Sequence, residues 1–219
     1  MDRIKAVIFD LDGTLLNTLE DIGNAVNQVL SSRGYPTHPV DRYRSFVGDG
    51  WELLIKRALP DLASTRDKVK ACVEESLVEY GNTWDATTSP YTGIPELLNY
   101  LTHEGIRLAV LSNKPHVFAQ QYVDKLLAEW TFEKVIGVST RFLKKPDPAG
   151  ALSILTELNI DKKNCLFIGD SGVDMQTAAA AGIFSVGAAW GFKPEAELMK
   201  NGCRFLARDP MDVLSLLVT

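Results

Sequence analysis

Five short apolar runs recur along the chain and set its predicted architecture. Each contains β-branched residues and at most one polar residue, without the alternation of a strand that faces water on one side. Such runs are typical of strands buried on both faces of a sheet. The runs are IKAVIF (4–9), IRLAVL (106–111), KVIGV (134–138), CLFIG (165–169) and IFSVG (183–187).

Helical patterns lie between the later runs. HVFAQQYVDKLL (116–127) and PAGALSILTELN (148–159) are two of them. Alternation of strands and helices predicts a parallel sheet covered by helices. The expected fold class is therefore α/β, with a Rossmann-like, doubly wound parallel sheet.

The stretch 17–88 interrupts this alternation, because it contains no convincing strand. In EDIGNAVNQVL (20–30) the apolar residues recur at the spacing of one helix face. A second helical pattern covers 65–81. Its start is predicted at Ser64, because Asp67 follows three residues later as in a capping box.

The domain organisation follows from this interruption. We expect an α-helical cap domain at 17–88, inserted just after the first strand. The α/β core domain would then consist of 1–16 and 89–219. The hinges are expected at Leu15–Thr18 and Ala86–Tyr91.

Composition excludes several classes of protein. The 219 residues are 46% hydrophobic and 23% charged, which is ordinary for a globular protein. The net charge of −5 argues against broad binding to nucleic acid or to an anionic membrane. Three dispersed cysteines without a CxxC motif make a disulfide framework or a zinc site improbable. With no signal peptide or membrane span apparent, we expect a cytoplasmic protein.

Polar residues follow three of the apolar runs, at the point where each predicted strand ends. These residues are Asp10, Ser112 and Asp170. In an open parallel sheet, ligands bind at the carboxyl ends of the strands. The three residues are therefore expected to converge on one crevice.

The segment DLDGT after the first run is the strongest chemical signal. Asp10 is placed to attack phosphorus as a nucleophile. Asp12 is two residues away, so both carboxylates can address one group in extended chain. Gly13 permits a sharp turn, and Thr14 offers a hydroxyl and an N–H to phosphate oxygens, so both residues are candidates for phosphate binding. The alternative is a plain strand end with an Asx-type turn.

Two later loops offer weaker candidates. In LSNKP, Ser112 can donate to a phosphate oxygen and Asn113 can orient a substrate or Asp12. The alternative is that either residue simply caps the next helix. In RFLKKPDP, Lys144 or Lys145 can neutralise phosphate charge and keep Asp10 ionised. The alternative for these lysines is a solvated loop.

The segment GDSGVD supplies two more carboxylates. If a helix begins near Ser171, Asp170 and Asp174 lie on adjacent parts of one face. The alternative is that Asp170 only caps the helix. Four carboxylates in one crevice, with Asp10 and Asp12, would repel one another and require a cation. Oxygen ligands of this kind suit Mg²⁺.

At this point the chain resembles the haloacid dehalogenase superfamily over essentially its whole length. Four motifs occur in the family's order, each after a predicted strand. They are FDLDGTL (9–15), LSNK (111–114), KKPDP (144–148) and GDSGVD (169–174).

The resemblance implies a role for each motif residue. Asp10 would be the nucleophile and Asp12 the general acid and base. Ser112 and Lys145 would bind the phosphoryl group, Lys145 being preferred because the family lysine directly precedes the proline. Mg²⁺ would be bound by Asp10, by Asp170 and by the main-chain carbonyl of Asp12. Asp174 would be either a further ligand or a residue that holds a ligand in place.

Three further segments are FVGDGWELLIKRAL (46–59), YTGIPELL (91–98) and the tail AAWGFKPEAELMKNGCRFL (188–206). Within the superfamily they resemble phosphoglycolate phosphatases, which implies a small phosphorylated metabolite as substrate. The sequence departs from that group at Asn17-Thr18 and at Thr92. In the cap, Gly48 and Gly50 are candidates for a loop that meets substrate. Arg57 is the site candidate among the cap cations that could pair with a substrate carboxylate, which also include Arg42, Arg44 and Lys56. The alternative for each of them is a solvated surface position.

Three other functions stay open at this stage. A phosphohexose mutase uses the same two aspartates, although its motif typically has Val at the position of Thr14. A pyrophosphatase of the same superfamily is a second alternative. A non-catalytic module that binds phosphorylated ligands is a third, from a different class. The oligomeric state, monomer or dimer, cannot be read from the sequence.

Overall fold

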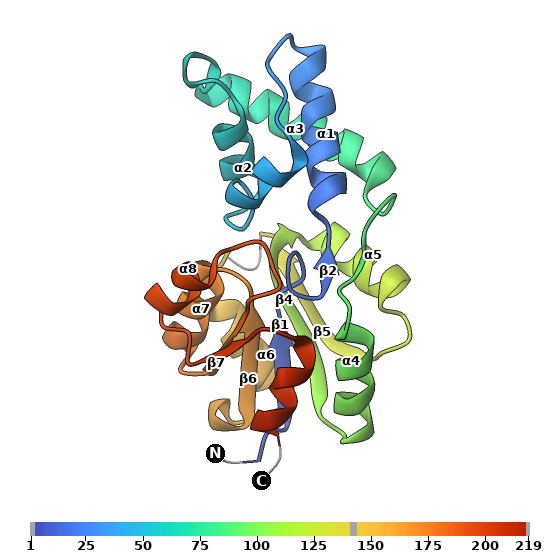
Figure 1. The fold of residues 1–219 in the computed structure, drawn as a ribbon, viewed down its shortest axis with the longest axis vertical. Coiled ribbons are helices and arrows are strands. Elements are labelled where there is room, and N and C mark those ends of the chain that lie inside the picture. Colours follow the sequence, from blue (N-terminus) through green and yellow to red (C-terminus); the bar gives the residue numbers. More distant parts are fainter. Residues whose placement is uncertain (1–2, 141–143, 218–219) are drawn as a thin grey trace. The chain divides into compact units, whose positions relative to one another are not determined.

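A computed structural model describes residues 3–140 and 144–217 of the chain. The chain divides into two compact units (Figure 1). The α/β unit contains Met1–Leu16 and Pro90–Thr219, and the helical unit contains Asn17–Ser89. The two strands that carry the chain between the units, β2 (Leu16–Asn17) and β3 (Ser89–Pro90), pair with each other.

One six-stranded sheet forms the centre of the α/β unit in the described residues. Its strand order is β5-β4-β1-β6-β7-β8, and neighbouring strands pair in parallel. The strands are β1 (Ala6–Phe9), β4 (Arg107–Pro115), β5 (Phe132–Val138), β6 (Cys165–Gly169), β7 (Phe184–Ala188) and β8 (Phe205–Ala207). The predicted fold class is confirmed.

The sheet is buried on both faces, as the uninterrupted apolar runs predict. Ala6 and Ile8 of β1 belong to a cluster that includes the apolar faces of two helices, α6 (Ala149–Glu157) and α7 (Gly172–Ala181). Val7 and Phe9 alternate with them and are also fully buried. β1 therefore lies in the middle of a doubly covered sheet, which fixes the position of whatever follows it.

The remaining helices complete the two units. The α/β unit also contains α4 (Ile94–His103), α5 (His116–Leu126), α8 (Glu195–Lys200) and the 3₁₀ segments Lys162–Asn164 and Pro210–Leu216. The helical unit contains α1 (Leu19–Ser32), α2 (Trp51–Ala58), α3 (Arg66–Thr83) and the 3₁₀ segments Val40–Ser45 and Asp61–Ala63. Within the described residues, none of the helices combines the length and apolar character that a membrane crossing requires.

Two local expectations differ from the structure, and one strand has no counterpart among the predicted elements. β4 does not end before Ser112 but continues to Pro115. The short strand β8 was not predicted, because its three residues give too little pattern. Helix α3 has Thr65 rather than Ser64 before its first residue, and no side chain caps it.

Asp21 organises the start and the end of the helical unit. Its buried carboxylate, in the first turn of α1, accepts hydrogen bonds from the N–H and the hydroxyl of both Thr87 and Thr88, at 2.7–3.1 Å. Sixty-six residues separate Asp21 from Thr87. The carboxylate thus ties together the segments by which the chain enters and leaves this unit.

This network predicts a large effect of Asp21→Ala. The substitution leaves buried N–H and hydroxyl donors unsatisfied, so we expect the helical unit to lose about 2–4 kcal/mol of stability. Hydrogen exchange should show lost protection at the Thr87 and Thr88 amides. The exposed Asp41→Ala is the control, because that side chain is 91% exposed. Equal protection in both variants would contradict the prediction.

Candidate active site

Asp10 lies at the carboxyl end of the central strand β1. Its N–H still donates to the carbonyl of Ile168 at 2.8 Å, so the backbone is held by the neighbouring strand β6. Its side chain is only 10% exposed, and its Oδ1 lies 2.8 Å from Nζ of Lys145. A carboxylate is thus fixed at the edge of the sheet where ligands bind.

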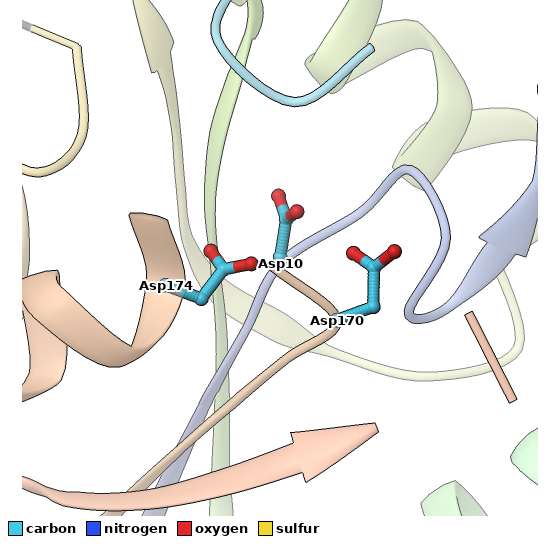
Figure 2. A group of neighbouring side chains, drawn as sticks. All are labelled: Asp10, Asp170 and Asp174. Atoms are coloured by element: carbon cyan, nitrogen blue, oxygen red, sulfur yellow. The ribbon is translucent and has the colours of Figure 1, made fainter. Parts of the chain in front are cut away.

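Two further carboxylates join Asp10 in a buried cluster (Figure 2). Asp170 directly follows β6, and Asp174 lies in the first turn of α7. One carboxylate oxygen from each of the three residues lies within 4.8 Å of the others. Asp10 and Asp170 are therefore brought together as predicted from the strand ends.

Asp174 is oriented by the start of α7. Ser171, not Asp170, precedes the first residue of this helix. The N–H and hydroxyl of Ser171 donate to Asp174 Oδ2 at 3.0 and 2.6 Å, in a capping box. The other oxygen of Asp174 accepts from Lys145 Nζ at 2.6 Å. The carboxylate group of Asp174 therefore has protein partners on both oxygens.

Asp170 is held by two segments of the α/β unit. The N–H of Phe192 donates to its Oδ2 at 2.7 Å, and the hydroxyl of Thr14 lies 3.4 Å from its Oδ1. Gly13 makes room for this carboxylate, because a Cβ at that position would lie 2.4 Å from Asp170 Oδ2. Gly13 also has a φ of +86°, which favours glycine.

Lys145, and not Lys144, reaches the carboxylates. Lys145 is buried, with Nζ close to both Asp10 and Asp174, whereas Lys144 is exposed. Asn113 fixes the loop that carries it: the Lys145 N–H donates to Asn113 Oδ1 at 2.7 Å, and Asn113 Nδ2 donates to the Lys145 carbonyl at 3.2 Å. The side chain of Asn113 is therefore engaged in holding Lys145.

Burial and mutual repulsion shift the pKa values of this cluster. Burial raises the pKa of Asp10 to about 7, which Lys145 opposes and Asp174 reinforces. Burial, with Asp174 and Asp10, raises the pKa of Asp170 well above its ordinary value. Burial alone would lower the pKa of Lys145, but Asp10 and Asp174 outweigh it and raise that pKa.

The charges of the cluster fit a bound divalent cation. Lys145 contacts two of the three buried carboxylates, Asp10 and Asp174. Its one positive charge leaves a net charge of −2 on these four side chains when all three carboxylates are ionised. Buried charges of one sign are unfavourable unless they are paired. Oxygen ligands of this kind match what Mg²⁺ prefers.

Asp12 belongs to a separate ion pair. Its side chain, 18% exposed, is absent from the three-carboxylate group and lies against Lys114. Nζ of Lys114 donates to Oδ1 at 2.9 Å and to Oδ2 at 3.2 Å. Lys114 is not among the site residues predicted from the sequence, although it stands in the LSNK motif. A lysine is rarely buried without a partner, but the partner is 102 residues away and invisible in the local sequence.

The loop after Asp10 uses two of the donors that were expected to bind phosphate. The N–H of Gly13 donates to the carbonyl of Leu16, and that of Thr14 donates to the carbonyl of Leu11. Ser112 does not cap α5, since Pro115 precedes that helix and no side chain caps it. The Ser112 Oγ instead accepts from the N–H of Lys114 at 3.3 Å.

The three candidates in the helical unit lie in and beside one loop. Gly48 and Gly50 both have positive φ, a backbone conformation that favours glycine. Arg57 pairs with Asp49 at 2.5 Å and donates to the carbonyl of Phe46 at 2.8 Å. Arg57 thus braces this loop from α2.

Comparison with known proteins agrees with this arrangement. The family model of haloacid dehalogenase-like hydrolases matches residues 7–188. The phosphoglycolate phosphatase of Pseudomonas putida is 33% identical over 191 residues, which cover 86% of this chain and 70% of that protein. That of Pectobacterium atrosepticum is 31% identical over 194 residues, covering 88% and 83% of the two chains.

A solved structure extends the similarity to the whole fold. The crystal structure of a protein from Lactobacillus delbrueckii subsp. bulgaricus matches this chain with a TM-score of 0.92 and 26% sequence identity. The match covers 99% of each chain. This chain belongs to the haloacid dehalogenase-like hydrolase family. With relatives of this kind, it is a phosphoric monoester hydrolase.

The cluster predicts a pH-dependent response to Mg²⁺. The pKa of Asp10 in the folded protein, about 7, lies above the value of about 3.9 in an unfolded chain. In EDTA the protein should therefore lose stability as the pH rises from about 4 through 7. Mg²⁺ should raise the Tm by about 5 °C at pH 8 and by less at pH 5.5, where protons compete for the carboxylates.

Asp10→Asn tests whether the cluster is the source of this response. The variant removes one repelling carboxylate, so its Tm in EDTA at pH 8 should be higher than that of the wild type. The exposed Asp161→Asn, at the residue that precedes the 3₁₀ segment Lys162–Asn164, is the matched control. A Mg²⁺ shift that is equal at both pH values, or unchanged in Asp10→Asn, would contradict the prediction.

Proposed function

We propose that the protein is a Mg²⁺-dependent phosphatase that hydrolyses a small phosphate monoester through an aspartyl-phosphate on Asp10. The observation that carries this proposal is the Asp10 carboxylate itself. It lies buried at the end of the central strand, beside a lysine and two further aspartates, with Asp12 two residues away.

Asp10 acts as the nucleophile. A carboxylate oxygen forms a bond to phosphorus while the bond from phosphorus to the ester oxygen breaks. Lys145 favours the ionised form of Asp10, because its ammonium lies 2.8 Å from Oδ1. The same ammonium stabilises negative charge on the transferring group.

Asp12 serves both halves of the reaction. It first gives a proton to the departing ester oxygen and so releases an alcohol. Its carboxylate then takes a proton from water, whose oxygen attacks phosphorus and displaces Asp10 as a free carboxylate. The partial exposure of Asp12, in contrast to Asp10, is consistent with contact with both the leaving group and water.

Mg²⁺ would be held by Asp10, Asp170 and the main-chain carbonyl of Asp12. When bound, it neutralises the phosphate charge and lowers the pKa of the surrounding carboxyl groups. Asp174 supports this site from behind, because Ser171 and Lys145 already donate to its two oxygens. Asp174 therefore orients Lys145 and adds negative charge.

The phosphoryl oxygens would be bound by Lys145, by the Ser112 hydroxyl and by backbone N–H groups of the loop after Asp10. Within the described residues, the N–H groups of Leu11 and Asp12 have no protein acceptor, unlike those of Gly13 and Thr14. We therefore assign the donor role to Leu11 and Asp12. Gly13 and Thr14 shape the loop and position Asp170.

The substrate is proposed to be a small ester such as phosphoglycolate. Support comes from the relatives named phosphoglycolate phosphatase, which cover most of this chain. We further propose that the helical unit acts as a cap that selects the substrate, with Gly48 and Gly50 in its recognition loop. Arg57 stabilises that loop rather than binding substrate, because Asp49 already pairs with it.

Phosphate release from a panel of monoesters tests the chemistry. With Mg²⁺ we expect turnover, led by 2-phosphoglycolate, and its loss in EDTA. Asp10→Asn should lower kcat by at least about 10⁴-fold, because an amide cannot replace the carboxylate as the nucleophile that forms the intermediate. Asp161→Asn should match the wild type. Turnover that persists in Asp10→Asn would overturn the aspartyl-phosphate route.

Asp12→Asn should expose the intermediate. An amide cannot activate water, so the phosphorylated enzyme should accumulate when a substrate with a good leaving group, p-nitrophenyl phosphate, is supplied. Mass spectrometry of the rapidly quenched protein should find one added phosphoryl group, in a peptide that contains Asp10. Accumulation should be absent from the double variant Asp10→Asn/Asp12→Asn, and a phosphoryl group elsewhere would refute the assignment.

A further inference from the structure

Strand β4 carries a buried lysine for which the proposed reaction has no task. The side chain of Lys114 is 1% exposed, which is unusual for lysine. Burying an ammonium is costly unless it is paired and hydrogen-bonded. A lysine in this position therefore requires an explanation from its partners.

The partners of Lys114 point to Asp12. Nζ contacts both carboxylate oxygens, at 2.9 and 3.2 Å, and lies 4.9 Å from the ring centroid of Tyr122. Tyr122 is fully buried in α5, so its ring forms a fixed wall behind the ammonium. Contact with both oxygens restricts the χ1 and χ2 torsions of Asp12 together.

The backbone of β4 is irregular where it delivers this lysine. β4 and β5 are in register at Leu111 with Ile136 and again at Pro115 with Val138, so the β4 side contains two extra residues. Such a bulge re-aims side chains near active sites. Gly137 of β5 accommodates it, since a Cβ there would lie 2.7 Å from the Lys114 carbonyl.

We propose that Lys114 is a positioning residue that holds the Asp12 carboxylate in the orientation from which it serves the leaving group and the water. The assignment rests on the proposed function, because it concerns the group that transfers the protons. Each aspartate of the DLD segment then has its own lysine: Lys145 holds the nucleophile and Lys114 holds the proton donor.

The two roles of Asp12 provide a specific readout. An alkyl phosphate needs a proton on its departing oxygen, whereas p-nitrophenolate departs without one. Misplacing Asp12 should therefore slow phosphoryl transfer from the alkyl ester but not from the nitrophenyl ester. Hydrolysis of the aspartyl-phosphate should slow for both, because it needs Asp12 as a base.

Lys114→Met keeps the length of the side chain and removes its charge. With 2-phosphoglycolate, kcat should fall about 10²-fold with KM changed by less than about threefold. With p-nitrophenyl phosphate, stopped flow should show a burst of about one nitrophenolate per enzyme, followed by slow turnover. The rate of this burst should lie within about threefold of the rate of the first turnover in the wild type. The exposed Lys162→Met serves as the control, and matching Tm values show that the fold is kept.

A double-variant cycle separates positioning from a general structural role. If Lys114 acts through Asp12, Lys114→Met should cost almost nothing further in Asp12→Asn. A further loss in the double variant, or equal slowing of the first turnover with both esters, would overturn the role of Lys114 alone. If the Asp10→Asn variant turned over substrate at the rate of the wild type, both the proposed function and this role of Lys114 would be overturned.

Discussion

The buried ammonium of Lys145 is the interaction on which the site depends. Three carboxylates from three segments meet at the end of β1 and β6, and two of them contact this one cation. Without it, burial and repulsion would drive protons onto the carboxylates, as the raised pKa values of Asp10 and Asp170 already indicate. The remaining negative charge is what makes the site suited to a divalent cation.

Placement of the Lys145 ammonium requires much of the α/β unit. Asn113 of β4 fixes the backbone of Lys145 with two hydrogen bonds, and Ser171 fixes Asp174 from the start of α7. Gly13 leaves the space that the Asp170 carboxylate occupies. Contacts from neighbouring segments therefore orient the charged groups of the site.

Two aspartates only two residues apart are held in different environments. Asp10 is almost buried and pairs with Lys145, whereas Asp12 is partly exposed and pairs with Lys114. Separate partners allow neighbouring carboxylates to carry separate tasks, because the surroundings and not the residue type set their chemistry. The same logic appears within the helical unit, where Asp21 uses its carboxylate for hydrogen bonds to Thr87 and Thr88.

The sequence alone determined the strands of the core and the residues at their ends. Apolar runs predict buried strands because burial on both faces leaves no polar position, and parallel strands bring Asp10 and Asp170 to one edge. It could not predict which partner each side chain selects. Asn113 holds Lys145, Lys114 reaches Asp12 across 102 residues, and Arg57 turns to Asp49. Those choices depend on the bulge in β4 and on loop packing, which involve contacts distant in sequence and leave no periodic pattern.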